Sequence, residues 1–259
     1  MMHVDLPTFD IPSACLLDKP VYKKMFSENA DLDATDKKAL SEDIERIRWL
    51  YTLKPETINV EAFVSREHEY TEIAVLTVEL NSANRAVRIA SFMHKAIPYP
   101  LLLIFLHHGK AAFCTAEKRI NQADTSKLVV GERQTTDWIN LSEPTEPQTA
   151  FLDAMRIGKL PSANFLGLYE GLTARIIELE ASKRTGSFGA VSTPVAKAQA
   201  EILQQIETYE REISDLRSKL KREKQMSRKI TLNTEIRQRK NTVQSLEDDL
   251  RQTAEQESI

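Results

Sequence analysis

Three side chains of this sequence have the chemistry of a catalytic site and lie in or next to predicted strands. Glu79 belongs to the β-branched segment TEIAVLTVEL (71–80), and His107 and His108 follow the apolar run LLLIFL (101–106). A carboxylate with nearby imidazoles can bind a divalent ion and activate water, as in nucleases of the PD-(D/E)xK type. Here Leu80 and Asn81 follow Glu79, so the lysine of that motif is replaced and its preceding aspartate is lacking. The three residues are therefore candidates for a degenerate nuclease.

A structural role accounts for the same residues. Adjacent residues of a strand point to opposite faces of the sheet, so His107 and His108 should not reach one metal ion together. They are then residues at the rim of a sheet, and Glu79 is a polar residue near a strand end. Gly186 and Gly189 lack the context of a phosphate-binding loop. We therefore predict no metal, no cofactor and a non-enzymatic protein, with the degenerate nuclease as an alternative.

The elements around these residues predict an α/β fold. The strand at 71–80 is followed by helical spacing of apolar residues over 86–97 and then by the strand at 101–106. This order indicates a βαβ crossover with two parallel strands in a mixed sheet with flanking helices. Gly109 permits a turn into an antiparallel strand, KAAFCTA. Residues 34–55 are predicted as a helix because Leu40, Ile44, Ile47 and Leu50 form one stripe.

The composition of the chain changes in its second half. The small, polar segment RTGSFGAVSTP (184–194) is typical of a linker. We therefore predict an α/β domain over residues 1–183 and a helical coiled-coil arm over residues 195–259. The arm is either one long helix or a helical hairpin, and the lack of glycine near its middle favours a continuous helix.

Heptad spacing in the arm predicts an oligomerisation or packing seam. A second seam follows the first but lies two residues out of phase with it. The predicted seam residues are Ile202, Ile206, Tyr209, Ile213, Leu216, Leu220, Leu232, Ile236, Val243, Leu246 and Leu250.

A basic segment lies in the middle of this arm. Residues 217–240 contain ten Lys and Arg against two Glu, while acidic residues precede and follow them. In a hairpin the acidic ends would lie side by side and the basic part would form the tip. The segment indicates binding to nucleic acid or to an acidic partner, the alternative being an ordinary solvated helix face. The predicted binding residues are Lys221, Arg222, Lys224, Arg228, Lys229, Arg237, Arg239 and Lys240.

Overall composition limits the partners. The 35 Lys and Arg and 38 Asp and Glu give a net charge of −3, so only the local basic segment suggests nucleic acid. The longest apolar run, LLLIFL, is far shorter than the ~20 residues of a membrane helix, so no membrane association is predicted. Cys15 and Cys114 lack a CxxC spacing, which fits a protein of the reducing cytoplasm.

Several blocks of this sequence together resemble the bacterial domain of unknown function 4391 family. They are EDIERIRWLYTLKPETINV (42–60), EIAVLTVEL (72–80), HKAIPYPLLLIF (94–105), TDWINL (136–141) and KREKQMSRKITLNTEI (221–236). The resemblance implies no catalytic residues, because the family has no assigned activity. It implies a companion of DNA methyltransferases and helicases in restriction or phage-defence clusters.

These observations lead to one hypothesis with two alternatives. We expect a non-catalytic accessory subunit of a bacterial DNA-modification or anti-phage system, with a DNA methyltransferase or helicase as partner. The arm would serve self-association or partner docking, and its basic segment would contact nucleic acid. The alternatives are the degenerate nuclease and a purely structural homo-oligomerisation protein.

Overall fold

The computed structural model of the protein describes residues 9–124 and 127–255, and the chain divides into two compact units, Met1–Ile176 and Ile177–Ile259. The strands are β1 (Leu16–Pro20), β2 (Ile44–Leu53), β3 (Phe63–Val64), β4 (Glu69–Tyr70), β5 (Ile73–Leu80), β6 (Leu101–His107), β7 (Lys110–Ile120), β8 (Leu128–Thr135) and β9 (Ile139–Asn140). The helices are α1 (Lys23–Asn29), α2 (Ala34–Lys38), α3 (Pro55–Ile58), α4 (Ala86–Ala96), α5 (Glu146–Ala154), α6 (Phe165–Thr185), α7 (Thr193–Arg222) and α8 (Met226–Glu255), with short turns of helix η1 (Ser13–Cys15), η2 (Ala39–Asp43) and η3 (Ile157–Lys159).

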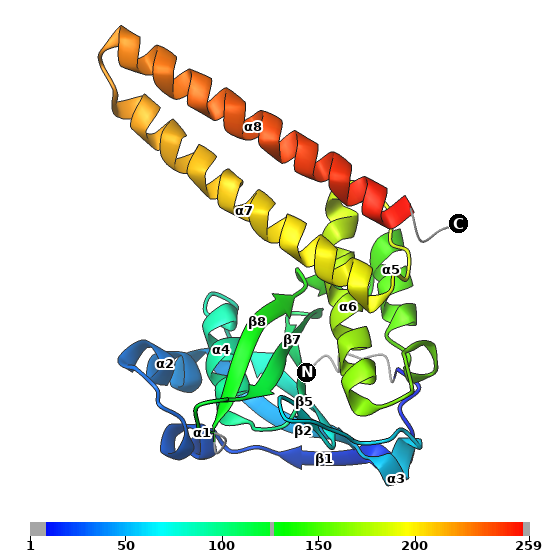
Figure 1. Cartoon of the computed structure of the whole chain (residues 1–259). Coiled ribbons are helices and arrows are strands. Elements are labelled where there is room, and N and C mark those ends of the chain that lie inside the picture. Colours follow the sequence, from blue (N-terminus) through cyan, green and yellow to red (C-terminus); the bar gives the residue numbers. More distant parts are fainter. Residues whose placement is uncertain (1–8, 125–126, 256–259) are drawn as a thin grey trace. The chain divides into compact units, whose positions relative to one another are not determined.

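The first unit is built on a mixed sheet (Figure 1). Its strand order is β1-β2-β5-β6-β7-β8, and β9 pairs with β7. Strands β5 and β6 are parallel and are connected by α4, whereas the other neighbouring strands are antiparallel. The predicted α/β fold with a βαβ crossover is therefore confirmed, as is the antiparallel strand after Gly109.

Helices cover both faces of this sheet. On one face α1, η2 and α4 enclose a core that includes Phe26, Met93 and Phe105. On the opposite face the ring of Phe151 in α5 lies 5.3 Å from that of Phe113 in β7, in an edge-on arrangement. The Tyr169 hydroxyl in α6 donates to the carbonyl of Leu101 over 2.9 Å. Burial on both faces explains why β5 and β6 consist almost wholly of apolar residues.

The predicted helix over residues 34–55 is wrong beyond Asp43, because residues 44–53 form β2. A β-bulge between Ile44 and Arg46 places both Ile44 and Ile47 on the face that packs against α4, opposite Leu80 and Val78. The bulge thus produces a three-residue spacing of buried side chains within a strand. A helix gives the same spacing, so the sequence pattern could not separate the two.

The turn between β6 and β7 consists of His108 and Gly109. Both residues have positive φ, 47° and 77°, as two-residue hairpins of type I′ require. Because His108 lies in this turn and not in the strand, its ring centroid is only 4.1 Å from that of His107. The prediction that the two imidazoles point to opposite faces is therefore wrong.

A small set of polar groups lies inside the core under α4. His94 is fully buried, and its Nε2 lies 3.5 Å from Sγ of Cys114. Lys118 donates from Nζ to the carbonyls of Ile97 and Tyr99 and thereby fixes the segment between α4 and β6. Burial lowers the pKa of Lys118 to about 7 and raises the pKa of the Cys114 thiol to about 11.

Burial also lowers the pKa of His94 to about 3, and the charges of Lys118 and Arg133 act in the same direction. The unfolded chain, in which an ordinary histidine titrates near pH 6.5, therefore binds the extra proton over the whole window between these values. Stability should fall as the pH is lowered through this window, by at most about 1.4 kcal/mol per pH unit. We expect His94→Leu to flatten this part of the profile, measured by urea unfolding at several pH values. An unchanged slope in the variant would contradict the assignment.

Candidate nucleic-acid interface at the hairpin tip

The second unit contains a helical hairpin made of α7 and α8, which lie side by side (Figure 1). Glu223 ends α7 in an extended conformation, with φ −71° and ψ 137°. Its Oε1 accepts hydrogen bonds from the amides of Lys224 and Gln225 over 2.7 and 2.8 Å. These bonds lower the pKa of the Glu223 carboxyl and satisfy amides of the bend. The bend therefore needs no glycine, and of the two arrangements that the sequence left open the structure has the hairpin.

The two predicted seams supply the packing inside the hairpin. None of the eleven seam residues is exposed, and Ile206, Ile213, Ile236 and Leu250 are buried. The structure therefore assigns these side chains to contacts within one chain. Whether copies of the chain also associate through the arm stays a prediction.

An arginine of α6 joins both helices of the hairpin. Arg184 donates to Glu210 of α7 over 2.9 Å and to Glu247 of α8 over 2.8 Å. Burial opposes the charge of Arg184, but the two carboxylates raise its pKa. Arg184 thus compensates the charge of one carboxylate from each helix at this end of the hairpin.

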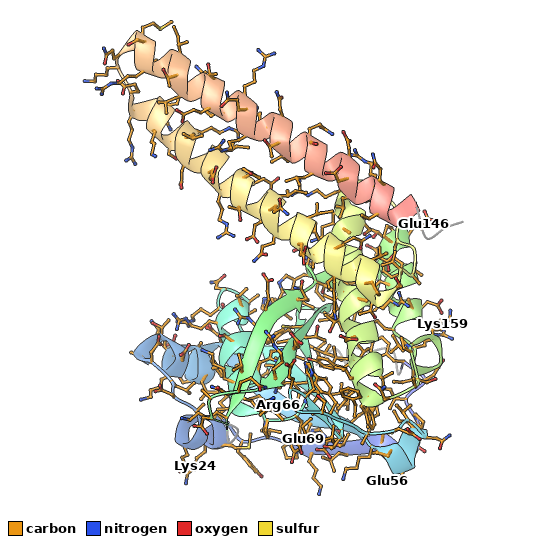
Figure 2. All side chains as sticks on the ribbon, in the orientation of Figure 1. Lys24, Glu56, Arg66, Glu69, Glu146 and Lys159 are labelled. Atoms are coloured by element: carbon orange, nitrogen blue, oxygen red, sulfur yellow. The ribbon has the colours of Figure 1, made fainter. Side chains whose placement is uncertain are left out.

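The opposite end of the hairpin is strongly basic. Residues 217–230 include seven Lys and Arg and one acidic residue, Glu223. In the part of the chain that the structure describes, this segment forms one ion pair, between Arg228 and Glu223 at 3.9 Å. The first unit differs, because exposed charges of both signs are interspersed there, as Lys24, Glu56, Arg66 and Glu69 illustrate (Figure 2). Like charges at neighbouring helix positions repel one another, so the tip carries an excess of positive charge that its own carboxylate does not balance.

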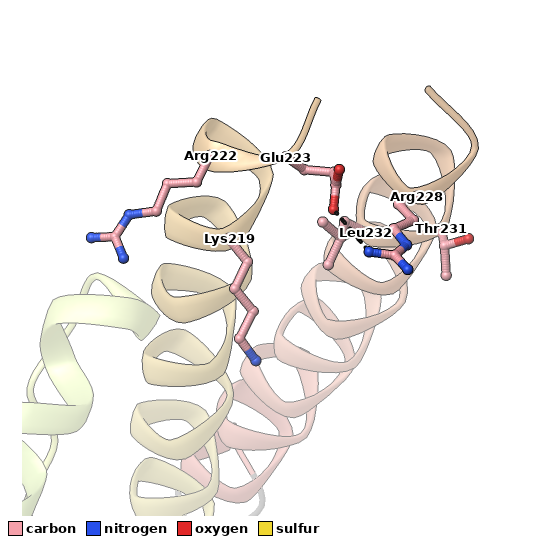
Figure 3. Close-up of a pocket in the computed structure, with 6 residues that line it drawn as sticks. All are labelled: Lys219, Arg222, Glu223, Arg228, Thr231 and Leu232. Atoms are coloured by element: carbon pink, nitrogen blue, oxygen red, sulfur yellow. Dashed lines mark ion pairs between the residues drawn. The ribbon is translucent and has the colours of Figure 1, made fainter. Parts of the chain in front are cut away.

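An open pocket of about 490 Å³ lies between the two helices at this tip (Figure 3). Three cations, one carboxylate, one hydroxyl and one apolar side chain line it: Lys219, Arg222, Glu223, Arg228, Thr231 and Leu232. Lys219 points into the space between the two helices, whereas Arg222 and Thr231 extend outward on either side of it (Figure 3). Sequence reasoning did not select Lys219 or Thr231, although Lys219 belongs to the same basic run.

The eight predicted binding residues do not share one environment. Lys221, Arg222, Lys224, Arg228 and Lys229 lie within two turns of the bend. Arg237 and Lys240 lie further along α8 and are exposed. Arg239 donates to Glu212 of α7 over 2.5 Å, and its guanidinium carbon lies 5.8 Å from the Tyr209 ring centroid. Arg239 therefore contributes to the packing of the hairpin.

The nuclease candidates do not converge in the first unit. Glu79 pairs with Arg46 at 3.8 Å and is level with Leu106 in the sheet. His107 is the next residue, so it points to the opposite face, where it packs against Trp138 at 5.9 Å between ring centroids. Its Nδ1 lies 2.9 Å from the carbonyl oxygen of Leu80. The sheet therefore separates the carboxylate from the imidazole of His107.

Within residues 9–124 and 127–255, no three His, Cys, Asp or Glu side chains are arranged to hold a metal ion. None of the helices in the same ranges combines the length and the hydropathy that crossing a membrane requires.

Comparison with known proteins places the chain in a family. A family model described as a domain of unknown function, DUF4391, matches residues 9–243. The chain belongs to the DUF4391 family. No curated protein and no solved structure matches it. The match covers most of the sheet-containing unit and continues through the bend into α8.

The joint of Arg184 with Glu210 and Glu247 generates a prediction about stability. Arg184→Gln leaves two neighbouring carboxylates without their shared cation, and we expect the free energy of unfolding to fall by about 1 kcal/mol. Faster hydrogen exchange of the α7 and α8 amides near Glu210 and Glu247 would locate the loss. The control is Arg211→Gln, which removes an exposed partner of Glu207 at 3.6 Å and should change little. Equal effects of the two substitutions would contradict the proposed joint.

Proposed function

We propose that this DUF4391 protein is a non-catalytic accessory subunit of a bacterial DNA-modification or anti-phage defence system, and that its hairpin tip binds nucleic-acid phosphates. One observation carries the binding proposal. Seven cations gather at the tip, and one of them, Arg228, has a carboxylate partner in the described chain. Neutralising phosphates with such cations releases counter-ions, which drives binding.

The proposed partner and location of the protein rest on other observations. A DNA methyltransferase or helicase as partner is proposed from the family resemblance. A reducing cytoplasm as its location is supported by two free, buried cysteines, Cys15 and Cys114. The nuclease alternative has no supporting geometry, because Glu79 and His107 lie on opposite faces of the sheet. Homo-oligomerisation through the seams also has no supporting geometry, since these side chains already pack inside the hairpin.

The charge of the tip gives a direct test. We expect the triple variant Lys224→Glu, Arg228→Glu and Lys229→Glu to lose binding to labelled nucleic acid in fluorescence anisotropy. For the wild type, log K should fall linearly with log salt concentration. A tip that contacts three phosphates gives a slope of about −2.7 on duplex DNA.

A matched control separates the tip from overall charge. Lys37→Glu, Arg66→Glu and Lys95→Glu reverse three exposed cations of the first unit and change the net charge by the same amount. This control should bind like the wild type. Failure of the wild type to bind any nucleic acid at low salt, or equal losses in both triple variants, would refute the proposal.

A further inference from the structure

Two large apolar side chains are exposed at the basic tip. Met226, the first residue of α8, is 71% exposed, and Ile230, one helical turn further, is 58% exposed. Residues four apart on a helix lie on the same face. The pair therefore forms a small apolar surface beside Lys224, Lys229 and the bend.

The same face of α8 continues with polar residues. Asn233, Arg237 and Lys240 follow at spacings of three, four and three residues, and all are exposed. With about 100° of rotation per residue, the five side chains from Met226 to Lys240 form one stripe that is about 21 Å long. The stripe begins with two apolar residues, continues with an amide and ends with two cations.

This combination of side chains matches one kind of nucleic-acid contact. Residues 217–240 contain no aromatic side chain, so the tip offers no platform for stacking unpaired bases. Proteins that enter the minor groove of duplex DNA combine Arg, Lys and Asn with apolar side chains such as Ile and Met that press between base steps. Cations on both helices of the tip can contact the phosphates on either side of that narrow groove.

We propose that the tip enters the minor groove of duplex DNA, with Met226 and Ile230 against the groove floor and Arg237 and Lys240 along the adjoining backbone. This inference rests on the proposed nucleic-acid binding by the tip and adds its substrate class. Apolar contacts of this kind unstack a base step, so the bound duplex is bent.

The test uses the full-length chain and a short A·T-rich duplex labelled at both ends with a fluorescence energy-transfer pair. The variant Met226→Ser and Ile230→Ser keeps every charge. We expect it to bind about tenfold more weakly, to keep the salt slope of the wild type, and to lose the increase in energy transfer that reports bending. Netropsin, which occupies the minor groove, should displace the wild type, and methyl green, which occupies the major groove, should not.

The control variant is Val64→Ser and Val87→Ser, which removes two similarly exposed apolar side chains, 67% and 69%, from the first unit. It should bind and bend the duplex like the wild type. If the wild type binds duplex DNA but the tip variant binds and bends it equally well, this inference fails and the proposed function stands. Preference for single strands or for duplex RNA also overturns it, and lack of all nucleic-acid binding overturns both.

Discussion

The packing of one apolar seam against the other is the interaction on which the second unit depends. The seams of α7 and α8 are two residues out of phase, so a continuous helix would present them on different faces. Reversing the chain at Glu223–Gln225 allows both seams to face each other. The Glu223 carboxylate makes this reversal possible without glycine, since it accepts the two amides of the bend.

The distribution of charge follows from the same fold. When the chain reverses, a basic segment flanked by acidic segments becomes a basic tip, and the acidic segments come together at the other end of the hairpin. The acidic end is partly balanced by Arg184, which contacts one carboxylate from each helix. The tip has no equivalent acidic group from elsewhere in the described chain, and its single glutamate is engaged by the amides of the bend. The tip therefore keeps an excess of positive charge, and Lys219, Arg222 and Arg228 are among the residues that line its open pocket.

The first unit buries its polar groups in contacts with one another. Its central strands are covered on both faces, and its buried polar groups serve packing: Lys118 holds the carbonyls that end α4, and Tyr169 spans β6 and β7. Arg85 donates to both carboxylate oxygens of the buried Asp43, which lowers the pKa of that carboxyl and joins the start of α4 to the start of β2. These groups bind one another within the fold, so they are not poised for acid–base work at a surface.

The sequence by itself determined the elements whose patterns are local. The strands around 71–80 and 101–106, the helix between them and the two heptad seams follow from side-chain periodicity, which neighbouring residues fix. The basic character of residues 217–240 is equally a property of sequence alone. Even the family could be recognised from blocks such as KAIPYP, whose carbonyls prove to be the acceptors of the buried Lys118.

Only the tertiary structure decided the features that depend on distant partners. Residues 44–53 became a strand because β5 offered an edge to pair with, and a bulge there imitates helical spacing. His108 approaches His107 because the chain reverses at that point, and Glu79 is separated from His107 because strand register assigns them to different faces. The choice between a continuous helix and a hairpin also depends on tertiary packing. Burial of the two seams against each other favours the hairpin, and Glu223 satisfies the amides of the bend without glycine. The pattern of each seam does not show which segment it packs against.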